Sequence, residues 1–299
     1  MTAFVDDITI GIPVYNEGRF INDTLLSVDG QAGTIIVSDN ASDDGTSDIC
    51  ADFARTRPYV RYHRYKENRG ATVNFNTCLD LADSRFFMYV GAHDLLLNDH
   101  TVKLKRKLLS SPAAITAYTN AFHVTPEDTE HGHKYVYDYH PLLSSDSMFE
   151  RVRAIAEHMT DGTFFHGLHR SEILKSVFKE RRVRGLSGSD HLLMMLLARR
   201  GKLVLCEDSF YVRMDPHRKE TSEVERWNRV LRAIDPENTN TLSAARTGPQ
   251  IIYAGQLKIL ADLVPETPED RRHLLQAKRA VVERWHWKNL GFDAPPPPK

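Results

Sequence analysis

The chain has 299 residues, of which 41% are hydrophobic, and its formal net charge at pH 7 is −1. A chain of this length can bury a sizeable core in one large domain, or in one domain with an appendage. The near-neutral charge gives no electrostatic footprint for nucleic acid, and no apolar run approaches the roughly 18 residues of a membrane span, so neither DNA, RNA nor the bilayer interior is expected as a partner.

Residues 1–120 alternate short apolar runs with segments of helical pattern. Such alternation is typical of an α/β domain with a mainly parallel sheet. Strands are predicted over residues 8–12, 34–38, 60–65, 86–90 and 113–118, and helices over 18–28, 44–57, 71–83 and 98–110.

A polar cluster follows each of the first four predicted strands. Ligands of such sheets bind beyond the carboxyl ends of the strands, so the four clusters are expected to converge on one site. They are PVYNE at 13–17, DNASDDGT at 39–46, KENRG at 66–70 and GAHD at 91–94.

From residue 147 onward the pattern is mainly helical. The last helix begins with Thr267 as N-cap and Asp270 three residues later, which is the spacing of a capping box. Helices are predicted over 147–159, 171–180, 189–200, 222–234, 248–263 and 268–289, with a strand pair at 202–207 and 209–214 and a solvated Pro-rich tail. Leu274, Ala277, Val281 and Trp285 would share one face of the last helix.

The second polar cluster concentrates acids at a strand end. Asp43 or Asp44 is expected to cap the following helix. Asp39 stands at the strand end itself and is better placed to accept a hydrogen bond from a ligand, such as a base imide.

Four motifs in this order and spacing resemble the family 2 glycosyltransferases, which are nucleotide-sugar enzymes with the GT-A fold. The motifs are IGIPVYNE, IIVSDNASDDGT, KENRGATVNFN and FFMYVGAHDLL, and a looser likeness continues to about residue 215. The resemblance implies a catalytic domain over 1–218, with a nucleotide-sugar half over about 1–120 and an acceptor half over about 121–218. Residues 219–299 would be a helical C-terminal extension outside it.

The resemblance also implies roles for individual positions around the nucleotide. Asp39 would hydrogen-bond the base, and Arg213 or Arg218 could hold the phosphates, since guanidinium groups suit them. Asn74 and Asn76 could contact the ligand or serve helix packing. Pro13, Tyr15 and Glu17 would line the nucleoside pocket, with Asn68, Gly70 and Ala92 near the nucleotide.

The fourth motif departs from the family pattern. Members usually carry Asp-x-Asp here, whose acids hold a divalent cation under the diphosphate. This chain has Gly91 at the first acid position and His93 at the last, followed by Asp94. Three alternatives remain open: His93 ligates a softer cation such as Mn²⁺, Asp94 is the ligand, or Arg and Lys side chains replace a Mg²⁺ or Mn²⁺ ion.

A second loop could complete such a metal site. Relatives often carry Tyr-Arg-x-His-Pro there, whereas this chain places Asp215 before Pro216 and His217 after it. The acid and the imidazole could therefore have been exchanged between the two loops, with Asp215 and His217 as further candidate ligands.

The catalytic base is expected at the start of the helix at 189–200. The family places its base at this junction, so Asp190 would take the proton of the acceptor hydroxyl, although it could also serve only as a helix cap. His191 is expected at the periphery or on the surface. His166 and His169 either contact the acceptor or pack in the core, and the His-rich run at 131–140 is expected to be an exposed hairpin or loop.

The leading interpretation is an inverting glycosyltransferase that moves a sugar from a nucleotide donor, with UDP expected, to a carbohydrate or lipid-linked acceptor. A nucleotidyltransferase and a non-catalytic sugar-nucleotide-binding scaffold are the alternatives. The absence of a visible secretory signal and three isolated cysteines indicate a cytoplasmic protein with reduced thiols. The C-terminal helices could pack on the catalytic domain, dimerise, or touch the inner face of a membrane through the end that carries Trp285 and Trp287.

Overall fold

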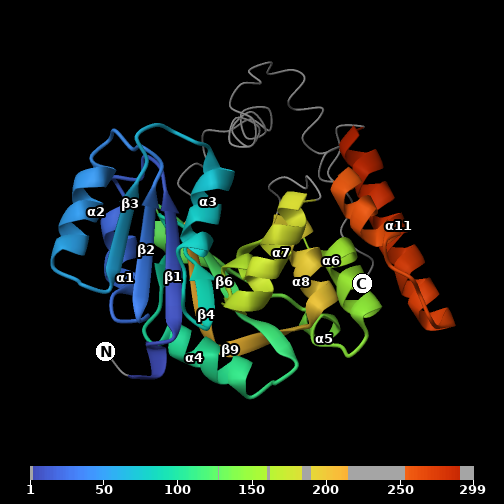
Figure 1. The fold of residues 1–299 in the computed structure, drawn as a ribbon. Coiled ribbons are helices and arrows are strands. Elements are labelled where there is room, and N and C mark those ends of the chain that lie inside the picture. Colours follow the sequence, from blue (N-terminus) through green and yellow to red (C-terminus); the bar gives the residue numbers. More distant parts are fainter. Residues whose placement is uncertain (1–2, 127, 160–161, 184–189, 215–252, 290–299) are drawn as a thin grey trace.

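A computed structural model of the chain describes residues 3–126, 128–159, 162–183, 190–214 and 253–289 (Figure 1). Within these residues, nine strands form one sheet in the order β3-β2-β1-β4-β8-β6-β9-β5, and β7 pairs with β6. The strands are β1 (Ile8–Val14), β2 (Thr34–Asp39), β3 (Val60–Arg64), β4 (Phe86–Tyr89), β5 (Leu95–Leu96), β6 (Ala114–Thr125), β7 (Asp128–Tyr135), β8 (Leu168–Arg170) and β9 (Lys202–Met214).

Helices connect and cover these strands. Two short 3-10 helices at Ala3–Val5 and Thr163–His166 and a helix over residues 253–261 complete the description. The other helices are α1 (Ile21–Val28), α2 (Thr46–Arg55), α3 (Ala71–Asp80), α4 (His100–Leu109), α5 (His140–Leu143), α6 (Met148–His158), α7 (Ser171–Val183), α8 (Asp190–Arg200) and α11 (Pro268–Asn289).

The first half of the sheet is parallel, as the alternating pattern predicts. β1 pairs in parallel with β2 and β4, and β2 pairs in parallel with β3. All seven residues of β1 and all four of β4 are buried, which is typical of strands with helices on both faces. The carboxyl ends of these four strands therefore meet at one edge.

Two apolar clusters fill the two faces of the sheet. Because successive side chains of a strand point to opposite faces, Phe87 and Tyr89 belong to one cluster and Phe86 and Met88 to the other. The first cluster includes residues of α3, α6, α7 and α8, and the second includes residues of α1, α2 and α4.

The second half of the sheet differs from the prediction in one respect. Instead of a strand pair at 202–207 and 209–214, a single strand β9 runs through Lys202–Met214 beside β6. The polar pair Glu207 and Asp208 resembles a turn in the sequence, but both residues are exposed where the β6–β9 register shifts. An irregularity of this kind admits polar residues without ending the strand.

The C-terminal helix α11 lies against α6, at the opposite end of the molecule from α2 (Figure 1). Its predicted capping box is confirmed: Thr267 Oγ1 accepts from the Asp270 N–H at 3.0 Å, and Asp270 Oδ2 accepts from the Thr267 N–H at 3.1 Å. The predicted apolar face is confirmed for Leu274, Ala277 and Val281, which are buried. The side chain of Trp285 and the predicted helix at 222–234 lie outside the described residues.

Cys50, Cys78 and Cys206 are buried free thiols. No helix in the part of the chain that the structure describes is long and apolar enough to cross a membrane.

Candidate active site

The turn after β4 is tied to the end of β9 through Asp94. This side chain is buried, and its two oxygens accept hydrogen bonds from the Tyr211 hydroxyl at 2.8 Å and from the Met214 N–H at 2.9 Å. The Tyr211 hydroxyl in turn accepts from the Gly91 N–H at 3.1 Å. A Cβ atom at Gly91 would overlap Asp94 Oδ2, so glycine at the first acid position is the residue that lets Asp94 take this place.

His93 in the same turn lies between two carboxylates. Its Nδ1 is 3.0 Å from Glu17 Oε1, and its Nε2 is 4.0 Å from Asp94 Oδ1. Burial lowers the pKa of His93, but the hydrogen bond to Glu17 and the negative charges of Asp94 and Glu17 outweigh it, so the pKa lies above its ordinary value. The Glu17 bond orients the imidazole so that Nε2 faces the Asp94 side.

The loops after β1 and β2 are joined by side-chain hydrogen bonds. Asn16, at a φ of 54°, exchanges two hydrogen bonds with Asp43, and the Glu17 N–H donates to Thr46 Oγ1 at 2.9 Å. Asp44 accepts from the Thr46 N–H and from the Gly18 N–H, but the N-cap of α2 is Gly45, so neither Asp43 nor Asp44 is the N-cap residue predicted from the sequence. These hydrogen bonds fix the loop that places Glu17 next to His93.

Asp39 at the end of β2 is fully buried and strongly hydrogen-bonded. Its carboxylate accepts from the Ser42 N–H, the Ser47 hydroxyl and the Tyr62 hydroxyl, and Arg64 Nε is 3.3 Å away. Burial raises the pKa of Asp39, but these hydrogen bonds outweigh it and hold the pKa below the ordinary value. The group is therefore a carboxylate acceptor at neutral pH.

The remaining predicted nucleotide residues surround the same edge. Tyr15 is 45% exposed, whereas Pro13 and Ala92 are buried. Asn68 accepts from Asn40 Nδ2 at 2.7 Å and from the Gly70 N–H at 2.9 Å, which fixes the loop after β3 to the end of β2. Asn74 is buried and donates to the Val14 carbonyl, a bond that anchors α3 to β1, and Asn76 is partly buried on α3.

Asp190, Arg213 and His166 lie on the other side of the turn. Asp190 is exposed at the start of α8, and its carboxylate sits so close to Gly162 that a Cβ there would overlap it. Arg213 donates to Thr163 Oγ1 at 2.9 Å. His166 donates from Nδ1 to the Tyr89 carbonyl at 3.1 Å and stacks on the Tyr211 ring with centroids 4.9 Å apart.

The charges of these groups act on His166 in opposite directions. Burial lowers the pKa of His166; the charge of Asp94 raises it, that of Arg213 lowers it, and that of Asp190 raises it less, leaving the pKa below its ordinary value. The neutral imidazole of His166 is therefore within the electrostatic influence of both Asp94, in the turn after β4, and Asp190, at the start of α8.

His169 and His191 have structural partners instead. Both nitrogens of His169 are bonded, to Thr116 Oγ1 and to the Phe165 carbonyl, and burial lowers its pKa to about 4. His191 Nε2 is 2.9 Å from the Met159 carbonyl. Of the His-rich run, His133 is exposed in the β6–β7 hairpin.

No cluster of three or more His, Cys, Asp or Glu side chains in the described residues is arranged to hold a metal ion. Within the described residues, His93 and Asp94 are the two candidate ligands that the turn after β4 brings together. Asp215, His217 and Arg218 lie outside the described residues.

Sequence reasoning did not single out Gly162, Thr163 or Tyr211. Tyr211 occupies one position of an alternating strand, and its contact with Asp94 joins residues 117 positions apart. No local pattern carries that information.

Comparison with known proteins agrees with this geometry. The family described as Glycosyl transferase family 2 matches residues 9–178, which include all four polar loops. The abequosyltransferase RfbV of Salmonella typhimurium is 29% identical over 107 residues, which are 34% of this chain and 32% of RfbV. The chain spans less than half the length of the curated relatives it matches.

Solved structures match over most of the chain. TarS of S. aureus in complex with UDP-GlcNAc has a TM-score of 0.55 at 16% identity, covering 95% of this chain and 87% of that one. The mannosyltransferase PcManGT of Pyrobaculum calidifontis, in complex with GDP-Man and Mn²⁺, has a TM-score of 0.51 at 17% identity, covering 94% and 87%. Likeness at this identity shows the fold, so the expected GT-A-like sheet with flanking helices is confirmed.

Proposed function

This chain belongs to glycosyl transferase family 2, and from that premise we propose that it transfers a sugar from a nucleotide-sugar donor to a carbohydrate or lipid-linked acceptor. The observation that carries the proposal is the meeting of Glu17, His93, Asp94 and Arg213 at the carboxyl edge of the parallel strands. Ligands of open α/β sheets bind at that edge.

We propose UDP as the nucleotide, in line with the UDP-GlcNAc complex of TarS. The exposed Tyr15 ring would stack on the base, and Asp39 would accept from the base imide. A carboxylate has about four acceptor positions, and Asp39 already faces four donors, so the imide would replace one of them. Arg64, with a side chain 46% exposed, is the one that can move into solvent.

A divalent cation fits the pair His93 and Asp94. Metal-binding histidines commonly donate their second ring nitrogen to a carboxylate, and Glu17 holds His93 in that way. Mg²⁺ is often bound by one or two protein carboxylates with substrate phosphates and water, and an imidazole ligand favours Mn²⁺. When bound, the ion would supply Lewis-acid stabilisation of the diphosphate leaving group.

Asp190 would act as general base in a single displacement. The acceptor oxygen attacks the anomeric carbon, the bond from that carbon to the diphosphate oxygen breaks, and the acceptor proton passes to the Asp190 carboxylate. Direct displacement inverts the anomeric configuration. Arg213, held by Thr163, would stabilise the negative charge on the departing diphosphate.

The proposal is tested by titrating UDP into the protein by calorimetry in chelator, in Mg²⁺ and in Mn²⁺. We expect binding that strengthens most in Mn²⁺ and a Glu17→Gln variant whose Mn²⁺ enhancement is reduced about tenfold or more, because a neutral amide holds the imidazole less strongly than the carboxylate does. Glu207→Gln, an exposed acid on β9, is the matched control. Equal binding in chelator would assign the phosphates to Arg213 and its neighbours instead.

A second assay separates the enzyme from a non-catalytic binding protein. Two features favour the non-catalytic binding protein: Asp94 is already hydrogen-bonded within the chain, and position 91 carries glycine in place of the family's first acid. We expect Asp190→Asn to bind UDP as the parent chain does and to lose sugar transfer and donor hydrolysis. An unchanged rate in Asp190→Asn would remove Asp190 as the base, and a parent chain that binds UDP without turnover on any acceptor would favour the binding protein.

We further propose that residues 1–218 form the transferase unit and that residues 219–299 are an extension through which it contacts a membrane or a second copy of the chain. The face of α11 away from α6 exposes Leu275 and Val282 next to Arg271 and Arg279. Such a face suits peripheral contact with an anionic membrane or with a second copy. Vesicle flotation and the molecular mass in solution distinguish the two, and a monomer that does not bind vesicles would exclude both.

A further inference from the structure

Two side chains from distant parts of the sequence donate hydrogen bonds to the same backbone carbonyl, that of Met159. Arg284, on α11, donates to it from Nη1 at 2.9 Å, and its Nη2 donates to the Glu157 carbonyl at 2.7 Å. His191, the second residue of α8, donates to the Met159 carbonyl from Nε2 at 2.9 Å. This carbonyl therefore joins the C-terminal helix to the start of the helix that carries Asp190.

The helix α6 lies between α11 and α8 and contacts both of them (Figure 1). Glu157 is in the last turn of α6, where the backbone carbonyls have no partner within the helix, and Met159 directly follows the helix and is buried. The dipole of α6 also favours a cation at this end. The two bonds of Arg284 therefore fix the end of α6 to α11.

The chain that follows Met159 comes directly to the proposed general base. Two residues separate Met159 from Gly162, so the Cα atoms of Met159 and Gly162 are at most about 11 Å apart. A Cβ atom at Gly162 would overlap Asp190 Oδ2, so the backbone at this point packs against the Asp190 carboxylate. Because the neighbouring His191 is bonded to Met159, a displacement of the Met159 carbonyl would be passed on to Asp190 by both routes.

Arg284 differs from other arginines of α11 in its surroundings. Arg272 and Arg279 are exposed and pair with acids of the same helix at 3.0 and 2.6 Å. The side chain of Arg284 reaches back to α6 instead. Burial lowers the pKa of Arg284, and nearby tyrosines and Glu157 raise it by less, so the pKa lies below its ordinary value. The chain thus brings a cation into a partly buried place and satisfies it with backbone carbonyls.

We infer that Arg284 is a positioning residue for the transfer reaction: through Met159 and Gly162 it holds the Asp190 carboxylate where it takes the proton of the acceptor. The inference rests on the proposed role of Asp190 as general base. A misplacement of about 1 Å caused by a change far from the chemistry can cost about a hundredfold in rate, so these bonds can affect the chemical step. The buried face of α11 thus supports the transferase unit, and its opposite face remains open to a membrane or a second copy.

The test measures kcat and the KM for the donor in Arg284→Gln, with the full chain and with hydrolysis of a UDP-sugar such as UDP-GlcNAc as the assay. We expect kcat to fall about tenfold or more, while KM and the affinity for UDP stay as in the parent. Arg284→Lys, whose amine can reach one of the two carbonyls, should recover part of the loss. His191→Phe removes the bond from the α8 side and should lower kcat in the same way, so it serves if Arg284→Gln does not fold.

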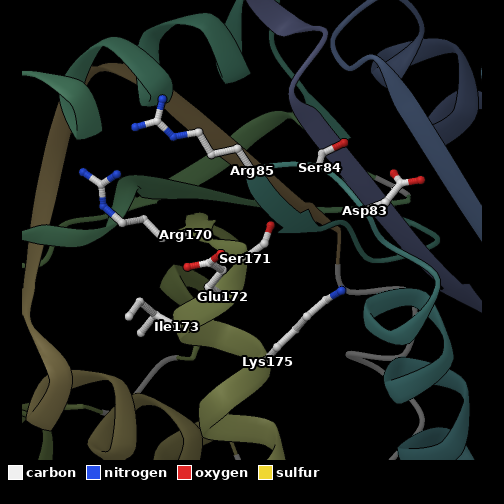
Figure 2. Close-up of a pocket in the computed structure, with 8 residues that line it drawn as sticks. All are labelled: Asp83, Ser84, Arg85, Arg170, Ser171, Glu172, Ile173 and Lys175. Carbon is white, nitrogen blue, oxygen red and sulfur yellow. The ribbon is translucent and has the colours of Figure 1, made fainter.

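A helix cap without a role in catalysis would lower stability alone, and Arg170→Gln is the matched control for that case. Arg170 also donates to a backbone carbonyl, from Nε to Ala114 at 2.8 Å. It pairs with Phe86 at the start of β4 and lines the pocket shown in Figure 2, at the opposite end of this strand from the GAHD turn. We expect Arg170→Gln to keep the kcat of the parent even where urea denaturation shows it to be as destabilised as Arg284→Gln. Arg279→Gln controls for the lost charge on α11.

The outcomes separate this inference from the proposed function. A kcat in Arg284→Gln that equals that of the parent, or a loss no greater than that of Arg170→Gln, would overturn the inference. A loss of UDP affinity that accounts for the lost rate would also overturn it. A parent chain that binds UDP without turnover, or turnover that Asp190→Asn leaves unchanged, would overturn the proposed role of Asp190 and this inference together. Turnover that depends on Asp190 but not on Arg284 would count against this inference alone.

Discussion

At the scale of single residues, the GAHD turn shows how one glycine determines the chemistry of its neighbours. Asp94 can reach Tyr211 and the Met214 N–H only because position 91 carries no side chain. Asp94 is then held in place by β9, and His93 is oriented by Glu17. The altered signature is therefore a set of coupled changes: the glycine at position 91 makes room for Asp94, and His93 stands at the last acid position beside Glu17.

The first prediction concerns this glycine. We expect Gly91→Asp, which restores the family's first acid in sequence, to lower the free energy of unfolding by about 1–3 kcal/mol and to weaken donor binding, because its side chain displaces Asp94 from buried hydrogen bonds. Urea denaturation and UDP titration measure the two effects. Leu97→Asp, at a 42% exposed position beyond the turn, controls for the added charge. A variant as stable as the parent with tighter metal binding would contradict this account.

At the scale of elements, β9 connects the second half of the sheet to the turn after β4, which follows the parallel half. It runs beside β6 along its length, pairs with β5 near its end, and carries Tyr211 and Arg213 to the turn after β4. Tyr211 packs against both His100 and His166. The strand therefore serves as framework and as part of the site.

The second prediction tests that joint through the Tyr211 hydroxyl. Tyr211→Phe leaves the buried Asp94 oxygen and the Gly91 N–H without a partner, so we expect the free energy of unfolding to fall by about 1–3 kcal/mol. Urea denaturation measures the loss, and Tyr15→Phe, which alters an exposed ring, is the control. Equal stability of Tyr211→Phe and the parent chain would show that the bond is not formed in solution.

At the scale of the whole molecule, local pattern predicted the parallel half of the sheet because β1, β2 and β4 are buried on both faces and each of the four strands ends in a polar loop. It did not predict β5 and β8, which have two and three residues and exist only through their partners. It placed Asp39, His93 and Asp94 at one edge, but not their bonding. The contacts of Asp94 with Tyr211 and of Asp190 with Gly162 depend on tertiary packing, which no spacing encodes.

The third prediction concerns stability against acid. Burial lowers the pKa of His100 to about 3 and that of His169 to about 4. Below pH 6.5 these two histidines are protonated in the unfolded chain but stay neutral in the folded chain. The free energy of unfolding therefore decreases as pH falls, by up to about 1.4 kcal/mol per pH unit for each histidine. Urea denaturation at pH 7, 6 and 5 should show this decline, and His169→Gln should have a shallower slope than the parent. Stability that is flat over this interval would contradict it.

The length of chain between the GAHD turn and its partners has a consequence for synthesis. Tyr211 and Met214 are added 117 to 120 residues after the groups they bind. At about 5–20 residues per second, the turn is synthesised roughly 6 to 24 s before those partners exist. The strands and helices of the nucleotide half can form in that interval, but Asp94 acquires its final bonds only when β9 arrives. A translation product that stops short of β9 would carry the four loops without a completed site.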